Sequence, residues 1–284
     1  MERIIFYNGT LQAESARPLS RAVHYGDGVF ETMRARNGRV FRLSEHFERL
    51  SAGLNVLRIT LPETAKLAAA VDGLLRANAL PEAVVKIIAF RGGPAGPLPA
   101  VHAPCVLITA EPFDHGMLAR NAAGISARIV SLRRDETSPL SGIKSLNYLV
   151  NIMARMEAAD SGDREALLLN RGGCVAEGAT STVFMVSSGS LRTPPLSSGA
   201  LPGITRAAVL KIARSLDLDC AEADIAPAEL KGADEIFLTN AGSGVMPLIM
   251  LDGRSVGAGR PGPVTLRCQA AYNETFARET GRRT

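Results

Sequence analysis

The sequence predicts an α+β protein built from two lobes. Strand-like and helix-like patterns are mixed along its 284 residues, without the steady strand–helix–strand alternation of a parallel α/β fold. There is no internal repeat, no low-complexity tract and no heptad pattern. A chain of this length can bury a full core as one large domain or two medium ones. We expect an N-terminal lobe over residues 1–113, a linker over 114–122 and a larger C-terminal lobe over 123–284.

The N-terminal part is expected to contain hairpins and two helices. The dipeptide Asn37-Gly38 favours a tight hairpin turn and separates predicted strands at 29–35 and 39–43. Ser44 is expected to cap a helix that follows the second strand. This part is completed by a helix at 62–78, buried strands at 84–90 and 106–110, a Gly- and Pro-rich loop at 91–99 and an irregular polar stretch at 113–122.

The C-terminal part is expected to alternate short strands with three helices. The patterns predict a strand at 125–132, a helix at 144–158, strands at 166–169, 174–176, 182–186 and 191–193, a helix from Leu201 to about Leu218, a strand at 236–239 and a closing helix from Pro263.

Composition excludes several classes of protein. Hydrophobic residues make up 46% and charged residues 21%, as in an ordinary globular protein. The net charge of +4 is spread over dispersed arginines, which argues against a nucleic-acid partner. No apolar run approaches the roughly 20 residues that span a bilayer, so we expect no membrane association. The four cysteines are scattered and the four histidines never cluster, so we expect no metal site and a cytoplasmic location.

Lys144 is the first residue that points to chemistry. Within the predicted helix at 144–158, spacings of four and seven put Lys144, Tyr148 and Asn151 on one stripe. A lysine removed from water has a lowered pKa and becomes an amine nucleophile that can form a Schiff base. The alternative is a lysine that reaches the solvent from a helix start. The buried side of this helix is expected to consist of the apolar residues Leu146, Leu149, Val150, Ile152, Met153 and Met156.

Three further segments could hold parts of a ligand. Glu177 follows a strand among small residues, where a confined carboxylate needs a cationic partner, although a surface acid at a turn would have the same pattern. Residues 202–205 (PGIT) open a helix whose N–H groups and hydroxyl could bind an anion, or could simply start the helix. The small-residue loop at 239–244 could approach a ligand closely. Together these are the parts of a pyridoxal 5'-phosphate (PLP) enzyme.

The order and spacing of these motifs resemble the class IV (fold type IV) PLP-dependent aminotransferase superfamily. This group includes branched-chain aminotransferases, D-amino-acid aminotransferases and 4-amino-4-deoxychorismate lyases, and the resemblance extends from residues 25–31 (YGDGVFE) to 262–265 (GPVT). It implies a small N-terminal lobe and a larger C-terminal lobe with a barrel-like sheet. It also implies a homodimer with the active site at the interface.

The resemblance also implies roles for single residues. Lys144 would be the Schiff-base lysine, and Glu177 would keep the pyridine nitrogen of PLP protonated. Tyr148 would face the phenolic oxygen of the cofactor. The phosphate would be bound by Arg49, Ile204 and Thr205, with Ala241 and Gly242 on the neighbouring loop, and the substrate would contact Tyr25 and Phe30.

The substrate is less defined than the cofactor. An amino-acid substrate needs a cation for its carboxylate, and the candidates are Lys86 and Arg91, with Arg133 and Arg134 as less favoured alternatives. We expect an aminotransferase that exchanges amino groups between an amino acid or amine and a 2-oxo acid. The runner-up is a lyase that releases 4-aminobenzoate and pyruvate from aminodeoxychorismate, because Ala241 and Gly242 stand where typical transaminases carry threonines. A third alternative is a non-enzymatic protein in which Lys144 merely starts a helix.

Overall fold

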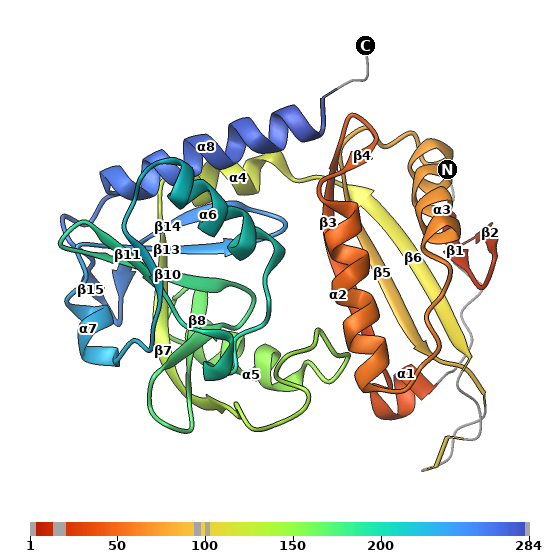
Figure 1. The fold of residues 1–284 in the computed structure, drawn as a ribbon, viewed down its shortest axis with the longest axis horizontal. Coiled ribbons are helices and arrows are strands. Elements are labelled where there is room, and N and C mark those ends of the chain that lie inside the picture. Colours follow the sequence, from red (N-terminus) through yellow and green to blue (C-terminus); the bar gives the residue numbers. More distant parts are fainter. Residues whose placement is uncertain (1–3, 14–20, 94–97, 100–102, 282–284) are drawn as a thin grey trace. The chain divides into compact units, whose positions relative to one another are not determined.

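The computed structural model describes residues 4–13, 21–93, 98–99 and 103–281 (Figure 1). Residues 94–97 of the expected Gly- and Pro-rich loop lie outside these ranges. The chain divides into two compact units. Unit 1 consists of Met1–Phe113, Ile143–Asn147 and Phe276–Thr284, and unit 2 consists of Asp114–Gly142 and Tyr148–Thr275. Residues 143–147, which include Lys144, therefore belong to unit 1.

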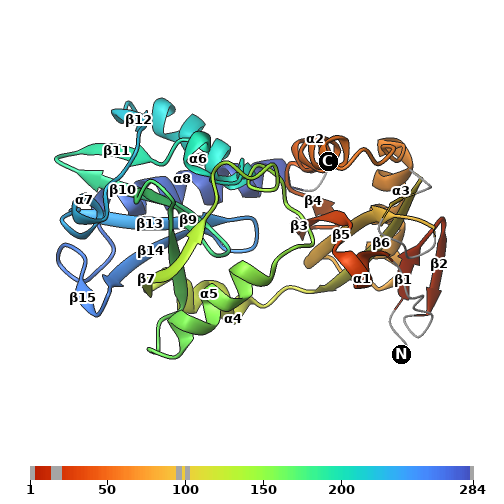
Figure 2. The same cartoon turned by 90° about the horizontal axis from the view of Figure 1, so that it is seen from below.

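Unit 1 is an antiparallel sheet covered by helices. Among the described residues the sheet has six strands in the order β2-β1-β6-β5-β3-β4. Its strands are β1 (Ile4–Tyr7), β2 (Thr10–Ala13), β3 (Gly28–Arg36), β4 (Arg39–Val40), β5 (Ala83–Arg91) and β6 (Pro104–Pro112). Its helices are α1 (Arg21–Tyr25), α2 (Leu43–Val56) and α3 (Thr64–Ala77). Helices α2 and α3 lie on the same face of the sheet (Figure 2), where α2 packs on β3 and α3 packs on β1 and β6.

The Asn37-Gly38 hairpin is confirmed, and the cap that follows it is not. Asn37 and Gly38 have φ angles of 52° and 71°, which Asn and Gly adopt most readily. Strand β4 is only two residues long, because the chain turns at once into α2. The N-cap of α2 is Arg42, whereas the hydroxyl of Ser44 lies inside the helix and donates to Glu45. The expectation that Ser44 caps this helix was therefore wrong.

Unit 2 is a larger mixed sheet. Among the described residues it has nine strands in the order β12-β11-β10-β13-β14-β7-β8-β9, with β15 paired to β14. Its strands are β7 (Ile125–Arg134), β8 (Glu165–Asn170), β9 (Val175–Gly178), β10 (Thr182–Ser187), β11 (Ser190–Thr193), β12 (Cys220–Glu222), β13 (Glu235–Asn240), β14 (Gly244–Leu251) and β15 (Arg254–Ser255). Its helices are α4 (His115–Ala122), α5 (Leu149–Ala159), α6 (Ile204–Ser215), α7 (Pro227–Lys231) and α8 (Pro263–Glu279), whose last residues belong to unit 1.

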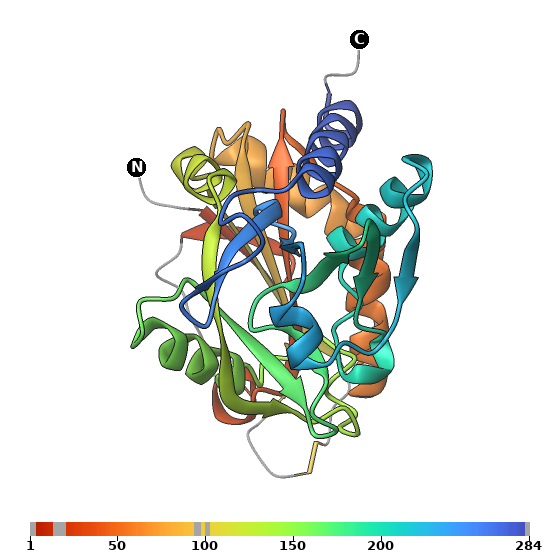
Figure 3. The ribbon, with the colours of Figure 1, turned by 90° about the vertical axis from the view of Figure 1, so that its left-hand side faces the viewer.

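The sheet of unit 2 curls on itself (Figure 3). Strand β9 contacts β10, although the two are not neighbours in the order of the sheet. This curled half-barrel confirms the barrel-like sheet expected for the C-terminal lobe, and the α+β class is confirmed with it. A core of buried aliphatic residues, including Val183, Leu238 and Leu248, fills one side of the sheet.

Two predicted segments differ from the structure in unit 2. The stretch expected to be irregular at 113–122 contains α4, whose N-cap Asp114 accepts a hydrogen bond from the Met117 N–H. The helix expected at 144–158 begins only at Leu149, so Lys144 lies outside it. The common stripe predicted for Lys144, Tyr148 and Asn151 was therefore wrong.

The buried side predicted for this helix was also wrong. Helix α5 buries Asn151, Ala154 and Ala158, and the two alanines pack closely against Val130 and Leu168. Its large apolar side chains point outward, because only small residues fit between the helix and the strands beneath it. Exposed fractions are 70% for Leu149, 41% for Val150, 48% for Ile152, 54% for Met153 and 61% for Met156.

Candidate active site

Lys144 lies on an extended segment that pairs with the start of β3. Its carbonyl accepts a hydrogen bond from the Phe30 N–H at 2.9 Å, and the Leu146 N–H donates to the carbonyl of Gly28 at 2.9 Å. Gly26 lies against the same segment with φ 61°, and a Cβ there would lie 2.8 Å from Asn147 Oδ1. A side chain at position 26 would therefore push the Asn147 side chain aside, and it would be strained at this positive φ.

The ring of Phe30 is contacted by two amines. Lys144 Nζ lies 4.4 Å from the ring centroid and Lys86 Nζ lies 5.0 Å from it. Phe30 and Lys86 come from the neighbouring strands β3 and β5, and Phe30 is only 8% exposed. With two amines beside one buried ring, one amine can act as a nucleophile and the other can bind a carboxylate, both close to an apolar surface. Of the substrate candidates in unit 1, the structure brings Phe30 against Lys144, and Lys86 contacts the same ring.

Arg49 belongs to a buried group of charges. Its Nε and Nη2 atoms lie 2.8 and 2.6 Å from the two carboxylate oxygens of Glu31, and His46 Nδ1 lies 2.6 Å from the same carboxylate. Burial acts to raise the pKa of Glu31, but the hydrogen bonds and charges of Arg49 and His46 outweigh it and hold this pKa below its usual range. Glu31 thus fixes the direction of the Arg49 guanidinium.

Arg91 forms hydrogen bonds that stabilise unit 1. Its three guanidinium nitrogens donate to Asp27 Oδ2, to the carbonyl of Arg58 and to the carbonyl of Leu57. Arg21 also pairs with Asp27 at 2.8 Å. Burial acts to raise the pKa of Asp27, but the hydrogen bonds from Arg91 and Arg21 outweigh it and lower this pKa. Tyr25, the remaining substrate candidate, is 45% exposed at the end of α1.

Glu177 is a buried carboxylate with the cationic partner that its position demands. It lies on β9 and is 6% exposed. Arg134 Nε lies 3.1 Å from Glu177 Oε1, and the Leu201 N–H donates to Glu177 Oε2 at 2.9 Å. Arg134 also donates to the carbonyls of Gly199 and Ser141, which fixes its position. Arg133, by contrast, donates to carbonyls of its own strand, including that of Val130.

Tyr148 and Asn151 share one acceptor. The Tyr148 hydroxyl donates to the carbonyl of Ala179 at 3.0 Å, and Asn151 Nδ2 donates to the same carbonyl at 2.7 Å. Burial, followed by the negative charges of Glu177 and Glu165, raises the pKa of the Tyr148 phenol to about 12. The phenol therefore stays protonated near neutral pH and can donate a hydrogen bond.

The start of α6 and the turn after β13 form the rest of the predicted cofactor site in unit 2. Gly203 is the N-cap of α6, and Ile204 and Thr205 are its first helical residues. Ala241 and Gly242 lie in the turn between β13 and β14. The Ser243 N–H donates to Asn240 Oδ1, and Asn121 donates to the Ser243 hydroxyl, which holds this turn. The N–H groups at the start of a 12-residue helix can bind an anion.

Several positioning residues escaped the sequence analysis. A cationic partner for Glu177 was expected, but Arg134 was considered only as a ligand for a substrate carboxylate. Glu31 and His46 were not singled out, although the motif at 25–31 includes Glu31. Their pairing with Arg49 joins β3 to α2, and no local sequence pattern reveals such a long-range contact.

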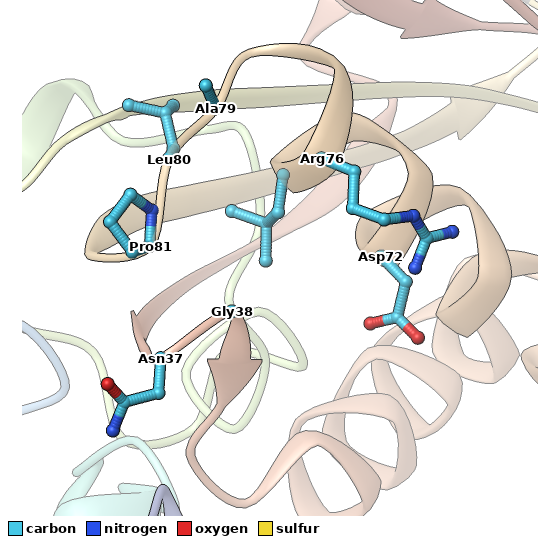
Figure 4. A pocket seen from close by; sticks show the side chains of 8 residues that line it. Asn37, Gly38, Asp72, Arg76, Ala79, Leu80 and Pro81 are labelled. Carbon is cyan, nitrogen blue, oxygen red and sulfur yellow. The ribbon is translucent and has the colours of Figure 1, made fainter. Parts of the chain in front are cut away.

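A surface hollow of about 370 Å³ lies elsewhere in unit 1. It is formed by the Asn37-Gly38 turn and by residues of α3 and of the chain that follows it, including Asp72, Arg76 and Pro81 (Figure 4). None of the predicted site residues lines it, so we assign it no role in the chemistry. In the described part of the chain no helix is long and apolar enough to cross a membrane.

Known proteins resemble this chain along its whole length. Residues 28–249 match the family profile Amino-transferase class IV. The branched-chain-amino-acid aminotransferase of Escherichia coli K12 is 34% identical over 97% of this chain and 94% of its own. The D-alanine aminotransferase of Staphylococcus haemolyticus is 32% identical over 95% of this chain and 96% of its own. The structure of the branched-chain amino acid aminotransferase of Thermobaculum terrenum in its PLP form has a TM-score of 0.88 and 28% identity, and covers 98% of this chain and 95% of that one.

The α+β fold, with its small antiparallel sheet and its larger curled half-barrel sheet, is that of the PLP-dependent class IV aminotransferases. The chain belongs to the class IV aminotransferase family, and it is an aminotransferase of the branched-chain or D-amino-acid type. The residues present fit PLP. A buried carboxylate balanced by Arg134 suits a ring nitrogen that carries a proton, and the α6 N-terminus suits a phosphate.

Proposed function

We propose that this aminotransferase transfers the amino group of a branched-chain amino acid to a 2-oxo acid. Full-length similarity to the branched-chain enzyme of Escherichia coli supports this choice. The sequence after Arg91-Gly92 supports it too, because Pro94 to Pro99 stand where D-amino-acid enzymes of the usual kind carry an arginine and a histidine. We also propose the division into lobes at 1–113, 114–122 and 123–284, although residues 143–147 and 276–284 belong to compact unit 1.

The proposal assigns a task to each residue of the cofactor site. Bound PLP supplies an electron sink for the bond that breaks at the substrate Cα. Lys144 Nζ carries the cofactor through a Schiff base and, when released, removes the proton from the substrate Cα. Glu177 holds a proton on the pyridine nitrogen. When PLP binds, the Tyr148 hydroxyl turns its hydrogen bond from the Ala179 carbonyl to the phenolic oxygen of the cofactor. The phosphate is bound by Arg49 and by the backbone of Ile204, Thr205, Ala241 and Gly242.

Lys86 is our choice for binding the substrate carboxylate. The main observation in favour of Lys86 is that Lys86 and Lys144 contact the same buried ring, that of Phe30. A carboxylate on Lys86 would therefore bring the α-carbon of an amino acid near Lys144, with Phe30 against its apolar side chain. Arg91 is the weaker candidate because its three nitrogens donate to other groups of unit 1.

A panel of amino donors tests this function. We expect transfer from leucine, isoleucine and valine to 2-oxoglutarate to exceed transfer from either enantiomer of alanine and from simple amines. Faster transfer from D-alanine would replace the branched-chain proposal by the D-amino-acid type. Release of 4-aminobenzoate from aminodeoxychorismate would favour the lyase.

The role of Lys144 has a test of its own. The purified protein should be yellow, and borohydride should fix the cofactor covalently at Lys144. A Lys144→Ala variant that kept both the colour and the activity would contradict the assignment.

A homodimer and a cytoplasmic location complete the proposal. The homodimer is supported by the exposed apolar side of α5, because a large apolar patch on a soluble protein marks an interaction surface. A second copy of this chain is the partner that we propose for this patch. The cytoplasm is supported by the four cysteines, all of which lie in the described residues and are unpaired.

A further inference from the structure

Two threonine side chains lie next to each other on one face of the sheet in unit 2. Thr182 on β10 is the direct antiparallel partner of Thr239 on β13. Directly paired residues of antiparallel strands project to the same face. Two residues along, Phe184 and Phe237 are also paired on this face, and their rings stack at 4.9 Å. Leu238, which lies between Phe237 and Thr239, faces the aliphatic core on the opposite side.

This face of the sheet lies at the start of α6. Thr182 Oγ1 is 3.0 Å from the position that a Cβ on Gly203 would occupy, and Gly203 is the N-cap of α6. The helix also packs against β13. The pair of threonines therefore lies beside the helix end whose first N–H groups have no acceptor within the helix.

The hydroxyl of Thr239 has an unsatisfied hydrogen bond. Thr239 is 2% exposed, and its Oγ1 atom has no hydrogen-bond partner among the described residues. A buried hydroxyl without a partner destabilises the folded state, so such groups are rare and often serve a ligand. Thr193, which is equally buried, illustrates the usual arrangement, because its hydroxyl donates to the Val183 carbonyl at 2.7 Å.

We propose that the Thr239 hydroxyl donates a hydrogen bond to a phosphate oxygen of PLP. The proposal rests on the proposed function, which puts the phosphate at the start of α6. Ala241 and Gly242, in the turn that follows Thr239, have no side-chain donor and can offer only backbone N–H groups. Thr239 thus supplies to this part of the site a hydroxyl that Ala241 and Gly242 lack, whereas the hydroxyl of Ser243, in the same turn, accepts a hydrogen bond from Asn121.

The substitution Thr239→Val tests the proposal because it removes the hydroxyl and keeps the branched shape. We expect the affinity of the apo-protein for PLP to fall about tenfold or more, as for a lost hydrogen bond to a charged group. The affinity for pyridoxal, which lacks the phosphate, should stay unchanged. Inorganic phosphate should raise the melting temperature of the wild-type apo-protein more than that of the variant.

Thr193→Val is the matched control. It removes a hydroxyl that has a partner, so it should lower the melting temperature of the apo-protein, whereas Thr239→Val should leave that temperature unchanged or raise it. An unchanged ratio of PLP to pyridoxal affinity in Thr239→Val would overturn the proposal, whatever the melting temperatures are. A wild-type protein that formed no bond between Lys144 and PLP would instead overturn the proposed function, so the two failures are distinguishable.

Discussion

Arg49 and Glu31 face each other through two parallel contacts, Nε to Oε1 at 2.8 Å and Nη2 to Oε2 at 2.6 Å. The side chain of Glu31 is completely buried and that of Arg49 is 9% exposed. Because two-point contacts fix both the distance and the plane of the guanidinium, Glu31 determines where the remaining face of Arg49 points. An arginine held in this way loses little conformational entropy when it binds an anion, which supports the role that we propose for Arg49.

Replacing Glu31 should destabilise the protein strongly. Glu31→Gln leaves the buried guanidinium of Arg49 without its counter-charge, and we expect a loss of about 3–5 kcal/mol in the free energy of unfolding. The matched control is Glu63→Gln, which breaks an exposed pair with Lys66 and should cost less than about 1 kcal/mol. Urea unfolding measures both. Equal losses in the two variants would contradict a buried charge pair at Arg49.

Stability should fall in acid through two carboxylates, the buried Glu31 and the half-buried Asp27. The pKa values of Glu31 and Asp27 are both lowered in the folded state. Below pH 4 the unfolded chain therefore binds more protons than the folded one, and their contribution is lost as pH falls through the folded-state pKa values. We expect Asp27→Asn to flatten the dependence of the unfolding free energy on pH in this range. A slope equal to that of the wild type would refute the contribution of Asp27.

Tyr148 should ionise at an unusually high pH. Burial and the charges of Glu177 and Glu165 raise its pKa to about 12, compared with about 10 for a free tyrosine. In an ultraviolet titration of the apo-protein, Tyr148→Phe should remove a transition near pH 12. Glu177→Gln should lower the pH of that transition, because it removes a negative charge. A transition that Tyr148→Phe removed near pH 10 would contradict the buried position.

Lys86 should act on the amino-acid substrate and not on the cofactor. We expect Lys86→Met to raise KM for the amino donor by about tenfold to a hundredfold, with little change in PLP affinity. Lys86→Arg should retain most of the activity, and Lys66→Met, at an exposed lysine of α3, is the control. An unchanged KM in Lys86→Met would exclude Lys86 as the carboxylate ligand. In contrast, Arg91→Met should mainly lower the melting temperature.

The apolar side of α5 should be needed for dimer formation. Met153→Glu puts a charge in the centre of this patch, and we expect sedimentation velocity to give a monomer. Lys211→Glu, on the exposed side of α6, is the control and should leave the dimer intact. A dimeric Met153→Glu variant would assign the contact between copies to another surface.

Most strands and the longer helices could be predicted because their patterns are local, whereas the short helices α1, α4 and α7 and the strand β14 were not predicted. The Asn37-Gly38 turn and the opening of α6 at Ile204 depend only on neighbouring residues. The start of α5 could not be predicted in this way. The helical spacing of apolar residues extends back to Leu146. Residues 143–147, however, pair with a strand more than a hundred positions earlier, and that pairing overrides the helical pattern.

The site was predictable in kind more than in detail. A small-residue context around Glu177 was enough to demand a cationic partner, but only the folded sheet identifies Arg134. The apolar positions of α5 could also be recognised in the sequence. A hydrophobic pattern marks residues that avoid water, and it does not tell whether the same chain or a second copy covers them.

The last residues of the chain also have a consequence for its synthesis. Phe276 packs on Phe41, Asn37 donates to the carbonyl of Thr280, and Arg39 donates to that of Gly281. The sheet of unit 1 is translated first, yet it gains these partners only when residues 276–281 leave the ribosome. A nascent chain that ended at Thr275 would lack Phe276 and would leave the ring of Phe41 exposed. Such a chain should depend on chaperones more than its intact N-terminal strands suggest.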